Sequence, residues 1–115
     1  MSDPPFVLDG KGRELTLQAI REVCEFRGWK LLAAHVRSNH VHVVVGADVE
    51  PERVMNDFKI YASRALNSVE GRGRKRWARH GSKRWLWKDQ DVRDAIRYVV
   101  DEQGEAMAVF LGEIP

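Results

Sequence analysis

Ser38-Asn39-His40-Val41-His42-Val43-Val44-Val45 combines strong strand formers with two histidines that lie two residues apart. Side chains along a strand alternate between its faces, so His40 and His42 project to one side. The valines at 41, 43 and 45 project to the other side, where a core can cover them. Two imidazoles on one face of a strand can bind one divalent metal ion. Taken alone, the pair is also compatible with a strand that merely shows two histidines to solvent.

The hydrophobic periodicities around this strand predict seven elements. The first is a short strand at 6–8, followed by a turn at 9–12 and by a helix with an apolar stripe from 15 to 26 that ends at Gly28. Two strands at 29–36 and 40–45 follow, joined by a turn at 37–39. The last three are a helix that begins at Pro51, a strand at 85–87 and a helix capped by Asp89 or Asp91. The first six follow the βαββαβ order of ferredoxin-like sheets. We therefore expect an α+β fold with an antiparallel sheet, helices on one face, an open second face and an additional C-terminal helix.

Length and composition limit the possible classes of protein. The chain has 115 residues, which suits one domain spanning residues 1–115, and 43% of them are hydrophobic. Its apolar runs are too short to cross a membrane, and its N-terminus lacks the features of a secretion signal. The single cysteine, Cys24, excludes an internal disulfide and lies in an apolar helix stripe. These features predict a cytoplasmic protein with no membrane partner.

Positive charge is concentrated in one segment, a predicted basic loop at about 69–84. Between Gly71 and Lys88 there are eight lysines or arginines and no acid, although the chain has 17 acidic residues elsewhere. Three tryptophans, at 77, 85 and 87, are interleaved with these charges. Cations that follow phosphates, beside aromatic rings on which bases stack, are typical of single-stranded nucleic acid binding. The alternative is a solvated loop whose tryptophans anchor the core.

The His-x-His strand is similar to the Asn-His-x-His strand of HUH endonucleases, and most similar to that of their single-tyrosine transposases of the insertion-sequence and REP-associated types. Phe58-Lys59 followed by Tyr61 and Asn67 resembles the family's second helix. Trp85-Leu86-Trp87 followed by Tyr98-Val99-Val100 resembles its closing strand and tyrosine helix. The likeness covers residues 15 to 105. It departs from the family in its short first strand and in Asp101–Glu105, where the family often has Asn-Pro.

The resemblance implies an enzyme that cuts and joins single-stranded DNA, in transposition or in a domesticated derivative of it. His40 and His42 would hold Mg²⁺ or Mn²⁺, and Tyr98 would attack the phosphate to form a covalent 5′-phosphotyrosine, with Tyr61 as the alternative nucleophile. The DNA would be a hairpin or a repeat, and the active unit either a monomer or a homodimer. A degenerate relative would bind DNA but cleave poorly.

The third metal ligand follows from the same resemblance, whereas the DNA contacts combine the basic loop with Lys59. Glu102 lies one helical turn after Tyr98 and offers a carboxylate suited to Mg²⁺, with Gln103 as the alternative. His35 is read as a sheet residue, and Asn39 as a turn residue. The expected DNA contacts are Lys59, Arg72, Arg74, Lys75, Arg76, Arg79, His80, Lys83 and Arg84.

Two other functions fit parts of the sequence. A non-catalytic nucleic-acid-binding domain would use the basic loop and the open sheet face. A histidine-triad-like nucleotide hydrolase would use the start of a His-x-His-x-His run, but position 44 is valine.

Overall fold

The computed structural model describes residues 7–71, 76–77, 85–86 and 88–113. Its elements, in chain order, are α1 (Gly10–Arg27), β1 (Lys30–Val36), β2 (Val41–Gly46), α2 (Pro51–Glu70), α3 (Asp89–Asp101) and β3 (Ala108–Leu111). Within these residues the strands form one antiparallel sheet in the order β2-β1-β3. The predicted α+β class with an antiparallel sheet is confirmed.

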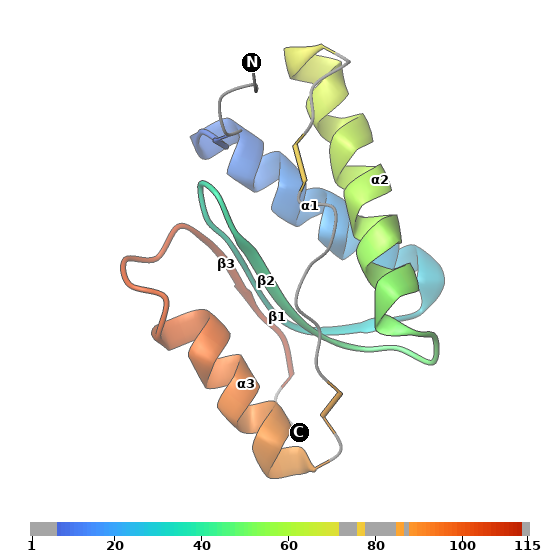
Figure 1. Ribbon diagram of the computed structural model, residues 1–115, viewed down its shortest axis with the longest axis vertical. Helices are drawn as coiled ribbons and strands as arrows, with labels where there is room; N and C mark the ends of the chain where they lie inside the picture. The colour runs from blue at the N-terminus through green and yellow to red at the C-terminus, as the bar shows by residue number, and fades with distance from the viewer. Residues whose placement is uncertain (1–6, 72–75, 78–84, 87, 114–115) are drawn as a thin grey trace, which may run out of the picture.

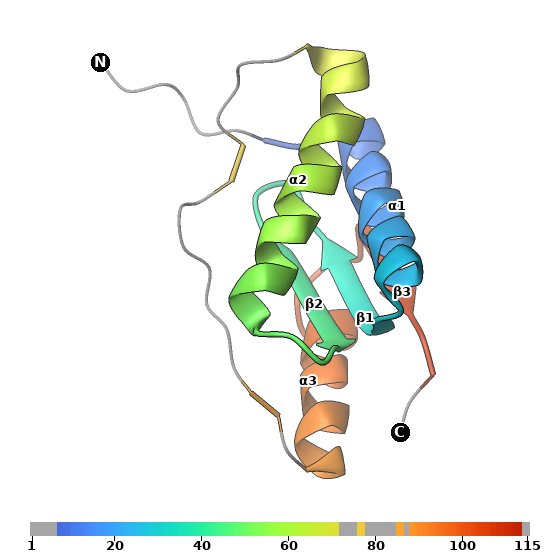
Figure 2. The same ribbon diagram turned by 90° about the vertical axis from the view of Figure 1, so that its right-hand side faces the viewer.

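The helices lie on both faces of the sheet. Figures 1 and 2 show α1 and α2 together on one side, and α3 on the other. We had expected the second face to be open. It is covered instead, because α3 packs across it. None of the described helices is long and apolar enough to cross a membrane.

Local sequence explains the limits of α1. The Asp9 side chain accepts a hydrogen bond from the Gly12 N–H (2.7 Å) and so caps the first turn. The predicted turn at 9–12 is wrong, since the helix already begins at Gly10. At the other end Gly28 adopts φ 73°, the left-handed conformation that ends helices, as predicted.

The β1–β2 hairpin has the predicted alternation. His35 lies opposite His42 and Val36 opposite Val41, with an irregularity between Leu31 and Ala33. Directly opposite residues share a face of the sheet, so His35 and His42 lie on the same side. The side chains at 43 and 45 pack on the other side, against the core beneath α1 and α2.

The other two predicted strands are not found among the described residues, which leave out one end of each, Phe6 and Trp87. Leu8 is buried and its N–H donates to the Ser38 carbonyl oxygen (2.7 Å), but this one bond does not make a ladder. Trp85 and Leu86 are not in a strand either. The sheet is instead completed by β3, which follows α3 in sequence and places Ala108 opposite Val36. The described elements therefore do not follow the βαββαβ order.

Two apolar clusters hold these layers together. The α1/α2 core contains buried side chains from both helices and the sheet, including Ile20, Val23 and Leu66. The α3 core is smaller and consists of Leu32, Ala33, Val44, Ile96 and Val99, with further apolar side chains packed against it. The α3 core thus fixes the last helix against β1 and β2, on the face that carries His42.

Candidate active site

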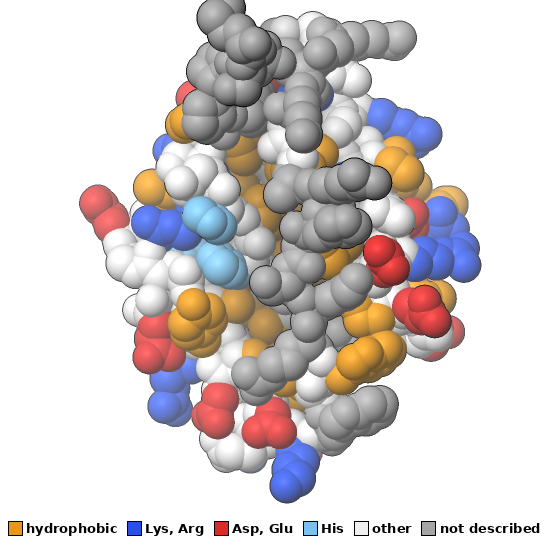
Figure 3. Space-filling view, in the orientation of Figure 1, with side chains coloured by type: hydrophobic (Ala, Val, Ile, Leu, Met, Phe, Trp, Pro, Cys, Tyr) orange, Lys and Arg blue, Asp and Glu red, His pale blue; other side chains and the backbone are white. Residues whose placement is uncertain are grey.

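The two histidines of the His-x-His pair lie side by side. His42 is a half-buried residue of β2, and His40 is exposed immediately before that strand. Their rings are stacked, with centroids 6.1 Å apart and planes inclined by 7°. The space-filling view shows histidine side chains together at the surface, next to a lysine or arginine side chain (Figure 3). Both imidazoles can therefore be reached from solvent.

Asn39 orients the first of these rings. His40 Nδ1 lies 2.9 Å from the Asn39 side-chain oxygen. Because that oxygen only accepts hydrogen bonds, Nδ1 carries the proton and donates it. The lone pair of the neutral ring is then on Nε2. Metal-binding histidines commonly have such a partner on their second nitrogen.

His42 is favoured in its neutral form. Partial burial is the main cause that lowers the pKa of His42 below its ordinary value of 6.5. Positive charge on the neighbouring His40 and Arg37 side chains lowers this pKa further. A metal ion binds the neutral imidazole, so the lowered pKa reduces competition from protons. The chemistry of this pair therefore fits two ligands of a divalent ion.

Tyr98 is the tyrosine that reaches the pair. The buried residues Ile96 and Val99 hold α3 on the sheet, and this leaves Tyr98 at its rim with 53% of its surface exposed. Its ring and the His42 ring are perpendicular to each other, with centroids 6.2 Å apart and planes inclined by 88°. The structure thus joins two side chains that are 56 positions apart in the sequence.

Tyr61 lies elsewhere. It is half-buried on α2 and packs against the α1/α2 core, which is on the opposite face of the sheet from the His pair. The Arg64 guanidinium lies 5.7 Å from the centre of its ring. These contacts are those of a packing residue.

The third metal ligand is still a prediction. Within residues 7–71, 76–77, 85–86 and 88–113, no three His, Cys, Asp or Glu side chains are grouped as a metal site would require. Glu102 is the exposed C-cap of α3, and its N–H donates to the Tyr98 carbonyl oxygen (3.3 Å). Gln103 is half-buried, and its Nε2 donates to the same oxygen (3.2 Å). Both candidates are thus tied to the turn that carries Tyr98.

Sequence reasoning underestimated two residues near the site. His35 is fully buried beside His42, and both of its ring nitrogens are hydrogen-bonded, so it has no free lone pair for a metal. Arg37 donates its backbone N–H to the His40 carbonyl oxygen (2.8 Å) and its Nη1 to the Glu105 carbonyl oxygen (3.0 Å). The sequence could have indicated the role of His35, because a histidine within an apolar strand needs hydrogen-bond partners.

The structure argues against the alternative of a histidine-triad-like hydrolase. Val44 occupies the position where a third histidine would stand, and it is only 6% exposed in the α3 core. It packs with Ile96 and Val99, so this position serves the fold.

Most of the predicted DNA contacts lie outside the described residues, namely Arg72, Arg74, Lys75, Arg79, His80, Lys83 and Arg84. Lys59 is half-buried on α2, in the helix layer on the far face of the sheet from the His pair. The structure therefore does not bring Lys59 to that pair.

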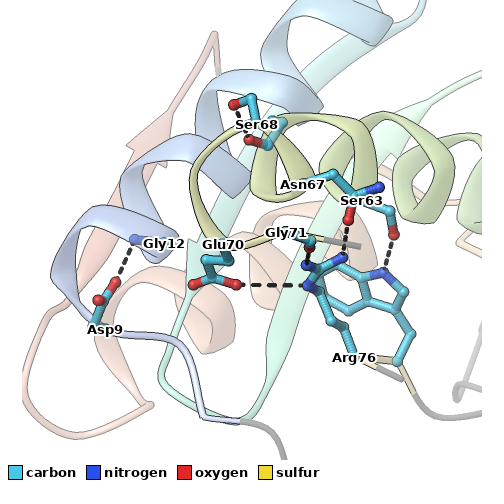
Figure 4. Close-up of polar contacts among 10 residues, drawn as sticks. Asp9, Gly12, Ser63, Asn67, Ser68, Glu70, Gly71 and Arg76 are labelled. Carbon is cyan, nitrogen blue, oxygen red and sulfur yellow. Dashed lines mark hydrogen bonds and ion pairs between the residues drawn. The ribbon is translucent and has the colours of Figure 1, made fainter. Parts of the chain in front are cut away.

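Arg76 is bound within the fold. Its guanidinium donates to the Asn67 side-chain oxygen (2.8 Å) and to the Gly71 carbonyl oxygen (2.9 Å) at the end of α2 (Figure 4). It also lies 3.6 Å from a Glu70 carboxylate oxygen, and its side chain is only 2% exposed. The next residue, Trp77, donates its indole N–H to Ser63 (2.8 Å) and packs on the α1/α2 core. Arg76 and Trp77 thus anchor the chain to α2.

An α+β domain in which a hairpin places a His-x-His pair beside a helical tyrosine has the layout of the HUH class. The family model described as "Transposase IS200 like" matches residues 5–106. The chain belongs to this family of transposases, whose substrate is DNA. No curated protein and no solved structure matches the chain significantly.

Proposed function

We propose that this transposase cleaves and rejoins single-stranded DNA through a covalent 5′-phosphotyrosine on Tyr98. His40 and His42 would hold Mg²⁺ or Mn²⁺, with Glu102 or Gln103 as the third protein ligand. The bound ion would stabilise the negative charge that develops on the phosphate. The contact between the rings of His42 and Tyr98 carries the proposal, because a phenol next to two imidazoles is what such a reaction requires.

The chemistry assigned to Tyr98 is a transesterification. Its phenolic oxygen bonds to the phosphorus, and the bond from phosphorus to the 3′ oxygen of the preceding nucleotide breaks. The phenol proton passes to solvent, and the leaving oxygen takes up a proton to become a 3′-hydroxyl. The exposed position of Tyr98 leaves room for the phosphate. Rejoining runs the same step in reverse, with a 3′-hydroxyl as the attacking group.

The decisive experiment looks for the covalent product. Labelled single-stranded DNA hairpins are incubated with the protein and Mn²⁺, and adducts that survive denaturation are separated on a gel. We expect an adduct with the wild type and with Tyr61→Phe, and none with Tyr98→Phe or His40→Ala. An adduct that is lost in Tyr61→Phe and kept in Tyr98→Phe would overturn the assignment. Binding of the hairpin by the wild type with no adduct would favour the non-catalytic alternative.

The same geometry supports catalysis within one chain, since Tyr98 contacts His42 of its own hairpin. An equimolar mixture of His42→Ala and Tyr98→Phe chains tests this. If each chain acts alone, the mixture forms no adduct. If two chains combine their side chains, the mixture regains activity and the protein acts as a dimer that shares its sites.

A further inference from the structure

His35 is an unusual residue for the interior of a sheet. It lies on β1 and is 0% exposed, and among the described residues only His35 and Thr16 are polar residues that are buried in backbone and side chain alike. A buried imidazole is costly unless its nitrogens are hydrogen-bonded. Both nitrogens of His35 have a partner, and the two partners are the informative feature.

The partners define one tautomer of the ring. The Met107 N–H lies 3.0 Å from His35 Nε2 and can only donate, so Nε2 accepts. The other nitrogen, Nδ1, lies 3.1 Å from the Val99 carbonyl oxygen, which can only accept. His35 is therefore a neutral ring with its proton on Nδ1, and it bonds to both partners at once.

These two bonds join three parts of the site. Val99 is in the last turn of α3, directly after Tyr98. Met107 directly precedes β3. On β1 itself, His35 lies opposite His42 in the register of the hairpin. One imidazole thus connects the end of the tyrosine helix, the start of the last strand and the strand next to the metal-binding pair.

Arg37 supports the same connection from its outer side. Its Nη1 donates to the Glu105 carbonyl oxygen, midway between α3 and β3, while its backbone N–H bonds to His40 at the turn. The segment that follows the tyrosine helix is therefore attached to the hairpin at two successive points, through Glu105 and through Met107.

We propose that His35 is a positioning residue that sets the placement of Tyr98 against His42. This inference rests on the proposed function of Tyr98 as the nucleophile. The bond from Nδ1 to Val99 fixes the helical turn next to Tyr98, whereas the bond from Met107 to Nε2 fixes the connection beyond it. Of the two, the bond to Val99 controls the alignment of the phenol, because it acts on the adjacent residue of the same turn.

Two substitutions separate these bonds. In His35→Asn the side-chain amide reaches the position of Nδ1, so the bond to Val99 is kept and the bond to Met107 is lost. In His35→Gln the terminal oxygen reaches the position of Nε2, so the bond to Met107 is kept and the bond to Val99 is lost. Each variant loses one hydrogen bond of the buried imidazole, and the two therefore form a matched pair.

The activity readout is the rate of adduct formation in a single turnover at saturating DNA, measured beside the affinities for DNA and Mn²⁺. We expect His35→Gln to slow the step about 10- to 100-fold without changing either affinity, because small misplacements of reacting groups cost that much. His35→Asn should stay near the wild-type rate. Val23→Ala, in the α1/α2 core on the other face, controls for lost stability. Equal rates for the two His35 variants, or an equal loss in Val23→Ala, would overturn the proposal.

A second readout does not depend on catalysis. In NMR spectra of the wild type, ¹⁵N shifts should report the proton on His35 Nδ1, and a nuclear Overhauser effect should join the rings of His42 and Tyr98. That effect should persist in His35→Asn and weaken in His35→Gln. A wild type with the proton on Nε2, or with no contact between the rings, contradicts the proposal even if the variants fail to fold. If the wild type forms no adduct, the proposed function fails, and the ring contact in the two variants still decides the role of His35.

Discussion

Replacing Arg76 by methionine should destabilise the protein and leave DNA binding unchanged, although the sequence suggests a DNA contact. The guanidinium donates hydrogen bonds to Asn67 and Gly71, and the Arg76 side chain is 2% exposed. A hydrogen bond from a charged group contributes about 1.5–3 kcal/mol, and neighbouring bonds are not fully additive. Methionine keeps most of the apolar stem. We therefore expect the free energy of unfolding to fall by about 2–4 kcal/mol.

Urea denaturation measures this loss, with Arg53→Met, at an exposed position of the helix α2 that Arg76 contacts, as the control that should change little. DNA affinity is measured in parallel as a function of salt. One phosphate contact adds about 0.7 to the slope of log K against log salt for single strands. A variant of Arg76 with unchanged stability and a slope reduced by about 0.7 would show that the guanidinium binds DNA, which would refute the structural role.

Three further perturbations test other parts of the structure. A Cβ at position 112 would collide with the Leu31 carbonyl oxygen, so Gly112→Ala should lower stability in urea by about 1–3 kcal/mol, whereas Gly46→Ala, which meets only ordinary contacts, is the neutral control. Burial raises the pKa of Cys24 from 9.0 to about 11, so the folded state keeps a proton that the unfolded state loses. The free energy of unfolding should therefore fall with rising pH between 9.0 and about 11, more steeply than in Cys24→Ala; parallel curves would contradict this. Asn39→Ala should weaken Mn²⁺ binding about 10- to 100-fold in calorimetry, because the adjacent histidine loses the partner that fixes its tautomer; unchanged binding would show that this partner is dispensable.

The hairpin and the position of Tyr98 could be predicted because each depends on a local pattern. Alternation at 40–45 places His40 and His42 on one face, whatever packs around them. The apolar stripe of the last helix defines which side is buried, and Tyr98 lies at the rim of that side. The meeting of Tyr98 with His42 followed only from the family resemblance, since periodicity does not say which face of a sheet a helix covers.

The last strand and the role of Arg76 could not be predicted for the opposite reason. β3 has four residues, and so short an apolar run has no period that separates a strand from a loop. Its pairing with β1 is a tertiary contact between distant segments. Arg76 lies in a run of like charges, and nothing in that run marks the one arginine that meets Asn67 and Gly71. Its partner Asn67 lies nine positions away along the chain, which is too far for a local pattern to indicate.

The short connection between α3 and β3 also limits how two copies of the protein could exchange segments. If α3 of one copy packed on the sheet of another copy, β3 would have to detach from β1 of its own sheet, because only six residues, 102–107, separate α3 from β3. Helix and strand would move together, and of the described strands only β1 and β2 would stay paired in the donor. An engineer who wanted such an intertwined pair would first have to lengthen that connection, so that the helix could depart while the strand stayed behind.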